Sequence, residues 1–425
     1  MSPAPGAEAT ISVRMYNVGF GDCFLIRIPT QQGQRRVLVD CGYHSQGKGK
    51  FSDSELVTQI KADLEGESLD VVIATHRHQD HISGFGETDL WREIGVEEVW
   101  LPFTAGKEAA QEEPALAAWE RLIEGVPSLV DERGQLSPAA AKAMGAREPG
   151  EQQDAAFMLW NARTNAPGIE NLLRGMRRKN GVVGPRRFLP EPGKDAPYEL
   201  ETPALPGVRV HVLGPPRDPK LRKQLSVPSH WGVAGSGDAG GLDGPAGSPF
   251  GREWRVPVDR LPGKRPFKDK SLQKIAGFNI DLLAAAKAVD GFLNGESLVL
   301  VLEVGAAKLL LTGDAEVGSW RNILGNPKAL ALASGATFLK VGHHGSHNAT
   351  PLIFLKENLG RKTLAMISTQ QGAGNYRKGI PRDALLDTLK ERDISVVRSD
   401  VSTGQSAGAF AQPKDAKWID CKIPC

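Results

Sequence analysis

The chain has 425 residues, enough for two or three average domains or for one large α/β domain with insertions. Its 52 basic and 50 acidic side chains give a net charge of +2, which by itself does not indicate a nucleic-acid-binding protein. No stretch reaches the roughly 20 apolar residues that a membrane helix needs. The N-terminus also lacks the basic and apolar regions of a signal peptide. We therefore expect a cytoplasmic protein without a membrane partner.

Strand and helix patterns alternate over the first hundred residues. One helix is expected after Ser52, because Ser52 and Glu55 match a capping box and apolar residues follow at helical spacing. Apolar runs bounded by turn residues predict the strands. These runs are 11–29, which indicates a hairpin turned at Gly19 and Gly21, and then 37–39, 71–75 and 96–101.

The middle of the chain differs in character from the first hundred residues. Residues 104–205 hold Ala- and Glu-rich segments separated by Pro and Gly, which predict a helical insertion. Residues 217–290 are rich in Gly and Pro and predict a long loop insertion. Both insertions offer surface that would shape a substrate channel or bind a protein partner.

Regular patterns return in the last third of the chain. Residues 382–392 indicate a helix. Two halves of mixed strand and helix favour two packed sheets with helices outside, within one domain of residues 1–425. The apolar runs that predict strands are 208–213, 297–302, 308–312, 337–341, 364–368 and 394–398.

The segment His76-Arg-His78-Gln-Asp80-His81 follows directly on the strand at 71–75. Residues two apart on an extended strand end point the same way, so His76 and His78 can reach one cation together. If the chain then turns, Asp80 and His81 face the same space, with room for a second ion. This donor mixture suits Zn²⁺, with Mn²⁺ and Fe as competitors. The alternative is a polar loop that happens to be rich in histidine, and the chain's nine histidines make such clustering by chance unexpected.

Three other expected strands also end in residues that can do chemistry. Asp40 and Asp314 each follow an apolar run, and His343 and His344 follow another. Strand ends are where α/β sheets present functional groups. Each signal is weak or moderate alone, but their recurrence at strand ends favours one shared site.

These motifs resemble the metallo-β-lactamase superfamily, in which H-x-H-x-D-H is followed by a bridging Asp and a final His. The resemblance is strongest to the hydrolase domain of ComEC-type competence proteins. It covers residues 11–101, 206–216 and 290–405 in the family's order, and it implies an αββα sandwich of two mixed β-sheets flanked by helices. The segments that carry it are Val18-Gly-Phe-Gly-Asp22, Leu38-Val-Asp40-Cys-Gly42, Thr75–His81, Leu310-Leu-Thr-Gly-Asp314 and Lys340-Val-Gly-His-His-Gly-Ser346, followed by Ile367-Ser368, Asn375-Tyr376 and Pro381.

The chain departs from the ComEC-type pattern at three points. His78 stands where those proteins usually have Asp, and Ile380 replaces a late His. No third-histidine motif precedes Asp314. Either His211, inside an expected strand, or His230, in the Gly/Pro-rich stretch, would be available to the first metal, but core packing or plain exposure is favoured for each.

The resemblance implies a centre for two metal ions, zinc (Zn²⁺) or alternatively Mn²⁺. His76 and His78 would bind the first ion and Asp314 would bridge. The second ion would be bound by Asp80, His81 and His343, where His343 is preferred to His344 because it follows Gly342 as the superfamily's final ligand does.

The resemblance implies further roles around the ions. Asp80 would also orient a metal-activated hydroxide and accept its proton, and His344 would contact the substrate or assist catalysis. Asp22 and Asp40 would orient the ligands, although capping a turn is an alternative role for Asp40. The residues implied in substrate binding are Ser346, His347, Asn375 and Tyr376.

The implied function is that of a metal-dependent hydrolase, a phosphodiesterase or nuclease acting on DNA or another nucleic acid in repair or defence. One alternative is a small-molecule hydrolase for a lactone, a β-lactam or a phosphocholine ester, against which the ComEC-type motifs and the insertions argue. The other is a partner-binding subunit of a larger complex, against which the complete ligand set argues.

Overall fold

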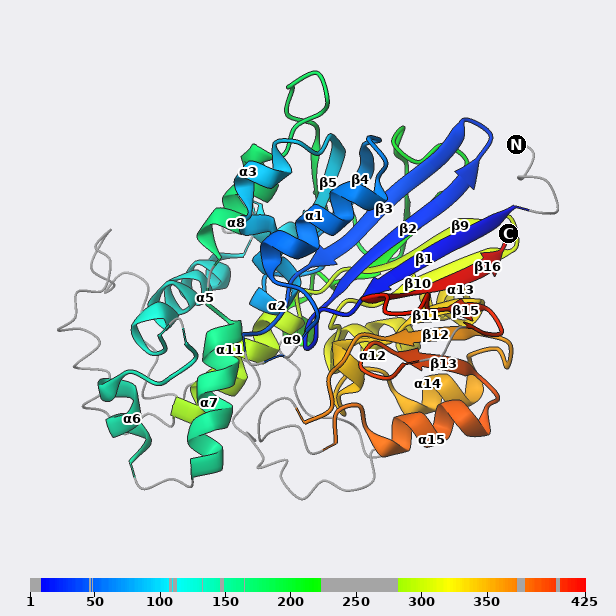
Figure 1. Cartoon of the computed structure of the whole chain (residues 1–425). Helices are drawn as coiled ribbons and strands as arrows, with labels where there is room; N and C mark the ends of the chain where they lie inside the picture. Colours follow the sequence, from blue (N-terminus) through cyan, green and yellow to red (C-terminus); the bar gives the residue numbers. More distant parts are fainter. Residues whose placement is uncertain are drawn as a thin grey trace.

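The computed structural model has two β-sheets that pack face to face, with helices on the outer side of each (Figure 1). This arrangement confirms the αββα sandwich. Both sheets are mixed, and each has a parallel half whose strand ends carry the residues of interest. The residues that the structure describes are 9–45, 47, 49–106, 109, 113–131, 133–145, 149–163, 165–222, 282–372, 379–402 and 406–425.

The first sheet begins with the expected hairpin and continues into parallel strands. Gly19 and Gly21 in the turn have φ values of 81° and 152°, a conformation that favours glycine. β1, β2 and β3 are antiparallel neighbours, whereas β3, β4, β5 and β6 are parallel. Among the described residues, the strands in spatial order are β14 (Ser406–Ala407), β15 (Phe410–Ala411), β16 (Trp418–Pro424), β1 (Thr10–Tyr16), β2 (Cys23–Thr30), β3 (Gly33–Cys41), β4 (Leu69–Ile73), β5 (Val96–Pro102) and β6 (Arg186–Leu189).

The second sheet has the same general plan. β7 to β10 are antiparallel neighbours, and β10 to β13 run parallel. The carboxyl ends of β10, β11 and β12 therefore lie at one edge. In spatial order the described strands are β13 (Ser395–Arg398), β12 (Leu364–Ile367), β11 (Phe338–Lys340), β10 (Ala307–Leu311), β9 (Val299–Val304), β8 (Arg209–Gly214) and β7 (Tyr198–Leu200).

Three apolar layers hold the sandwich together. Side chains from both sheets, such as Phe24 and Leu300, form the layer between the sheets. The outer face of the first sheet is covered by α1 (Asp53–Asp63), which begins at the expected Ser52 capping box, and by α3 (Thr88–Trp91). The outer face of the second sheet is covered by α12 (Val317–Gly325), α13 (Pro327–Ser334), α14 (Leu352–Glu357) and α15 (Asp383–Glu391).

Helices from the two expected insertions pack together beside the sandwich (Figure 1). The end of the range 104–205 contributes β6 and β7 to the sheets, so only its earlier part is helical. Residues 282–290, expected as loop, belong to α11, because its Leu and Ala side chains bury an apolar face against α6 and α7. These helices are α5 (Pro114–Gly125), α6 (Pro138–Met144), α7 (Pro149–Asn161) and α11 (Leu282–Asn294). The short helix α8 (Ala166–Glu170) packs against the outer layer of the first sheet, and α9 (Pro219–Arg222) lies against α12.

Short helical turns connect several of these elements. None of the helices in the described part of the chain is long and apolar enough to cross a membrane. The remaining helices and turns are α2 (Gln79–Ile82), η1 (Ser83–Gly86), η2 (Phe103–Ala105), η3 (Val126–Ser128), η4 (Asn171–Gly175) and η8 (His343–Gly345).

Candidate metal centre

The His-rich segment lies where β4 gives way to the short helix α2. His78 has extended backbone angles and is the residue from which α2 begins, so His76 and His78 lie on the strand extension. Asp80 and His81 lie within the helical turn that follows. All four side chains are buried. The change from strand to helix thus brings the four side chains together in one buried region.

Asp80, His81 and His344 form one group whose donor atoms lie within 4.8 Å of one another. Nε2 of His344 lies 3.1 Å from Oδ2 of Asp80, and Nε2 of His81 lies 3.7 Å from Oδ1 of Asp80. Asp314, from the loop after β10, places Oδ2 at 3.1 Å from His81 and 3.8 Å from His344. Two carboxylates and two imidazoles thus face a common point.

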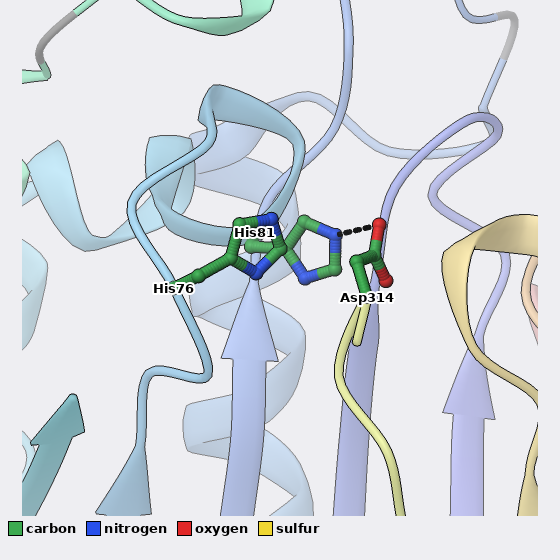
Figure 2. A group of neighbouring side chains, drawn as sticks. All are labelled: His76, His81 and Asp314. Atoms are coloured by element: carbon green, nitrogen blue, oxygen red, sulfur yellow. Dashed lines mark hydrogen bonds and ion pairs between the residues drawn. The ribbon is translucent and has the colours of Figure 1, made fainter. Parts of the chain in front are cut away.

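A second group shares two of these residues. His76, His81 and Asp314 also have donor atoms within 4.8 Å of one another, and Figure 2 shows the two rings and the carboxylate side by side. Nε2 of His76 is 3.0 Å from Nδ1 of His78. His81 belongs to both groups of three, and Asp314 lies 3.8 Å from His344 of the other group.

The hydrogen-bond partners of the rings determine which nitrogens can bind an ion. The carbonyl of Ser368 accepts from Nδ1 of His344 (2.9 Å), and the carboxylate of Asp40 lies 2.8 Å from Nδ1 of His81. Because these oxygens can only accept, each Nδ1 carries a proton, and Nε2 is the ring nitrogen that faces the centre. Such oxygen partners are typical of histidines that bind metal ions.

The same reasoning applies to the first two histidines of the motif. The hydroxyl of Thr75 donates to Asp40 (2.7 Å), so its oxygen accepts from Nδ1 of His76 (3.1 Å) and leaves Nε2 of His76 unprotonated. Nε2 of His78 lies 3.6 Å from Oδ1 of Asp290 and has no hydrogen-bond partner among the described residues. Nε2 of His76 and Nδ1 of His78, which face each other at 3.0 Å, are close enough to bind one cation together.

Buried charge sets the protonation of the remaining donors. Burial alone would raise the pKa values of Asp80 and Asp314, but the nearby charge of His81 outweighs it and lowers both. Although burial lowers the pKa of His81, the same carboxylates raise it more, so an ion bound at Nε2 of His81 would displace a proton. Burial lowers the pKa of His76 well below its usual value and that of His78 to about 4. Ionised carboxylates and neutral imidazoles are the forms that bind metal ions. Oδ1 of Asp80 is buried without a hydrogen-bond partner among the described residues, so the donor set fits a cation.

The structure places the two consecutive histidines opposite to the sequence-based expectation. His344, not His343, lies beside Asp80, whereas Nδ1 of His343 lies 3.5 Å from Oε1 of Glu316. Both histidines have left-handed backbones, with φ of 49° and 52°, which turns the loop and sends their side chains apart. Gly342 packs tightly against this site, because a Cβ atom there would lie 3.0 Å from the carbonyl oxygen of Gly313.

Asp40 and Asp22 lie behind the ligands. Asp40 accepts the Thr75 backbone N–H (2.7 Å) in addition to the Thr75 hydroxyl and His81. Asp22 forms an ion pair with Lys340, whose ammonium also lies 3.4 Å from Oδ1 of Asp314. Although burial lowers the pKa of Lys340, the charges of Asp22 and Asp314 raise it more, so the lysine stays charged.

Several residues near the centre were missed by the sequence reasoning. Lys340 belongs to one of the motifs that carry the family resemblance, but its pairing with buried carboxylates was not predicted. A Lys at the end of an apolar strand is a usable signal of a buried ion pair. Arg77 is partly buried and pairs with Glu120 of α5 (2.7 Å) and with Glu296 (2.9 Å), and so it ties the motif to the insertion. Asn161 of α7 accepts the backbone N–H of Asp80 at 3.1 Å. Pairings so distant along the chain leave no local pattern.

The residues expected to bind substrate are only partly described. Ser346 is buried and its hydroxyl donates to Asn348 (2.9 Å), while His347 is exposed. Asn375, Tyr376 and His230 lie outside the described residues.

His211, considered for the first metal, lies elsewhere. Nε2 of His211 is 3.1 Å from Glu303, and the ring belongs to none of the metal-capable groups found among the described residues.

Comparison with known proteins agrees with this geometry. The family model of the metallo-beta-lactamase superfamily matches residues 16–133, which include the whole His-rich segment. A stretch of 110 residues is 37% identical to ComE operon protein 3 of Bacillus subtilis (strain 168). That match covers 25% of this chain and 13% of the relative, so the chain corresponds to a small part of that protein's length.

Proposed function

We propose that this metallo-β-lactamase-fold hydrolase binds two divalent cations and cleaves phosphodiester bonds, with DNA or another nucleic acid as its substrate. The observation that carries the proposal is the orientation of the histidine rings. His81 and His344 each have Nδ1 engaged by an oxygen acceptor, so each turns its Nε2 toward Asp80 and Asp314. A merely polar loop would not need that common orientation.

The ligands divide naturally between two ions. His76 and His78 would bind the first ion, and Asp80, His81 and His344 the second, with Asp314 shared. Imidazole and carboxylate donors suit Zn²⁺, and Mn²⁺ is the alternative. In this assignment His344 takes the place that the resemblance gave to His343.

The chain's own residues supply positioning and proton transfer. When bound, two cations at such a centre provide a nucleophilic hydroxide near neutral pH and neutralise charge on the scissile group. Asp80 has one oxygen directed at His344 and a second, Oδ1, that is buried without a described hydrogen-bond partner, so Oδ1 is available to orient the attacking water and accept its proton. Asp40 and Thr75 hold the rings of His81 and His76 so that the donor atoms do not rotate away.

The choice of phosphodiester follows from the motif resemblance to ComEC-type hydrolase domains. A donor set of this kind would also hydrolyse lactones, β-lactams or phosphocholine esters, because the nucleophile is the same. Substrate choice therefore has to be tested across classes.

A substrate panel tests the proposal. Protein loaded with Zn²⁺ or Mn²⁺ is incubated with plasmid DNA, single-stranded DNA, RNA, bis-p-nitrophenyl phosphate, a lactone, a β-lactam and a phosphocholine ester. We expect cleavage of the nucleic acids and of bis-p-nitrophenyl phosphate, and its loss in an Asp80→Asn/His81→Gln variant. His211→Gln is the matched control, because His211 is also a buried, ion-paired histidine but lies away from the centre. Turnover of only the lactone, β-lactam or phosphocholine ester would refute the nuclease assignment, and equal cleavage by the double variant would refute the site.

A further inference from the structure

Three segments that are far apart in the sequence bring further ligand-type side chains together beside the metal centre. Asp290 lies on α11, Glu316 immediately precedes α12, and His343 lies in η8. One donor atom from each lies within 4.8 Å of the others. The group is distinct from the two groups described above, since none of the three residues belongs to either.

Two polar atoms of this group lack hydrogen-bond partners among the described residues, whereas Asn294 donates to Oε1 of Glu316 (2.9 Å) and to Oδ2 of Asp290 (3.4 Å). Glu316 is buried, with 3% of its side chain exposed, and its Oε2 has no hydrogen-bond partner among the described residues. Nδ1 of His343 is also buried without a hydrogen bond and lies 3.5 Å from Oε1 of Glu316. Leaving a buried carboxylate oxygen and an imidazole nitrogen unsatisfied is costly unless a ligand completes their coordination.

The two carboxyl groups lie close to each other, since donor atoms of Asp290 and Glu316 are within 4.8 Å. When both are ionised they repel each other, and a cation between them removes that repulsion.

We propose that Asp290, Glu316 and His343 bind an additional divalent cation, separate from the two ions of the centre. Two carboxylates and one imidazole form a donor set suited to Mn²⁺ or Zn²⁺. About 15% of the His343 side chain and 16% of the Asp290 side chain is exposed, so an ion can enter from solvent.

The additional site is coupled to the centre by two contacts. The backbone N–H of His343 donates to Oδ1 of Asp314 at 3.0 Å, and Oδ1 of Asp290 lies 3.6 Å from Nε2 of His78. An ion bound by Asp290, Glu316 and His343 would therefore place positive charge next to His78 and Asp314 of the centre. The inference concerns ion binding and does not depend on which bond the centre hydrolyses.

Counting bound Mn²⁺ tests the site. Metal-stripped protein is titrated with Mn²⁺, and the free ion is measured by its electron paramagnetic resonance signal. We expect Glu316→Gln and Asp290→Asn each to bind one ion fewer than wild type, or to bind it at least about 100-fold more weakly. His211→Gln should match wild type, and His344→Ala combined with Glu316→Gln should lose more than either change alone. An ion count in both Glu316→Gln and Asp290→Asn equal to that of wild type would overturn the proposal.

Thermal unfolding separates metal binding from a structural role. Glu316→Gln keeps the shape of the side chain and replaces a buried carboxyl group with a neutral amide next to Asp290, so without metal it should be at least as stable as wild type. With Mn²⁺ present, it should gain a smaller increase in Tm than wild type gains. If Glu316→Gln lowers Tm equally with and without Mn²⁺, Glu316 has only a structural role and the proposal fails.

Discussion

Replacing Lys340 with Met would remove the only described cation whose ammonium contacts both Asp22 and Asp314. Met has nearly the same length, so the main change is the loss of one buried positive charge. Two unit charges 3.4 Å apart, the distance from Lys340 to Asp314, interact by about 5 kcal/mol at an effective dielectric constant of about 20. Leaving one side of a buried ion pair uncompensated typically costs about 3–5 kcal/mol. We expect the metal-free Lys340→Met protein to lose about 3 kcal/mol of unfolding free energy. The loss lies at the lower end of this range because the substitution also removes the cost of burying the ammonium.

Bound metal should change this result. A cation held by Asp314 and its neighbours supplies the positive charge that Lys340→Met removes, so the loss should be smaller in the Mn²⁺-loaded protein. Urea unfolding followed by tryptophan fluorescence, with a chelator and then with Mn²⁺, measures both values. Lys308→Met is the matched control, since 31% of the Lys308 side chain is exposed and its partner Glu303 keeps an ion pair with Arg209, so the substitution should cost at most about 1 kcal/mol.

Two results would refute the reasoning about Lys340. One is a metal-free loss no larger than that of Lys308→Met, which would mean that the buried carboxylates do not need the lysine. The other is an equal loss with and without Mn²⁺, which would mean that no cation binds near Asp314.

Three further predictions concern single side chains. His344→Ala should weaken Mn²⁺ binding at the centre by more than about 100-fold, whereas His343→Ala should leave the centre's ions in place and remove only the additional ion. Calorimetric titration with Mn²⁺ distinguishes the two variants. If His343→Ala weakens binding at the centre and His344→Ala does not, His343 is the ligand. Asp40→Asn should weaken Mn²⁺ binding about 10–100-fold. The Asn amide can donate to Nδ1 of His81, which favours a proton on Nε2, the nitrogen that would bind the ion. Unchanged Mn²⁺ affinity would show that Asp40 does not orient His81. Burial raises the pKa of Asp53 to about 6, above its unfolded value, so this group's stabilisation is present below about pH 4 and is lost as the pH rises through 6. Asp53→Asn should therefore be more stable than wild type at pH 7 by about 2 kcal/mol and no more stable at pH 4; a pH-independent difference in chemical denaturation would show that the charge is not the cause.

Patterns local in the sequence predicted much of the fold. The hairpin at 11–29, the capping box at Ser52 and the strands that precede Asp314 and His343 all lie where expected. Each depends on nearest neighbours: alternation along a strand, a side chain that caps a helix, or glycine at a positive φ. The αββα architecture followed from the family resemblance and is confirmed by the two sheets.

Features that depend on tertiary packing could not be predicted in the same way. The sequence does not show which of His343 and His344 faces Asp80. The left-handed backbone at both residues turns the loop so that His344 does, and this depends on tertiary structure. Asp290 lay in a stretch expected to be loop, because the apolar face of α11 has meaning only against α6 and α7. Lys340 was not assigned a role, since its partners Asp22 and Asp314 come from two other segments.

The rate of plasmid DNA cleavage as a function of added Mn²⁺ tests the central claim most directly. Metal-stripped wild-type protein should be inactive and should gain activity as Mn²⁺ is restored. Asp314→Asn, which removes the carboxylate that lies beside both His81 and His344, should lower the rate by more than about 100-fold at every Mn²⁺ concentration. Cleavage by the metal-stripped protein, or an Asp314→Asn rate equal to that of wild type, would contradict a metal-dependent phosphodiesterase centred on these residues.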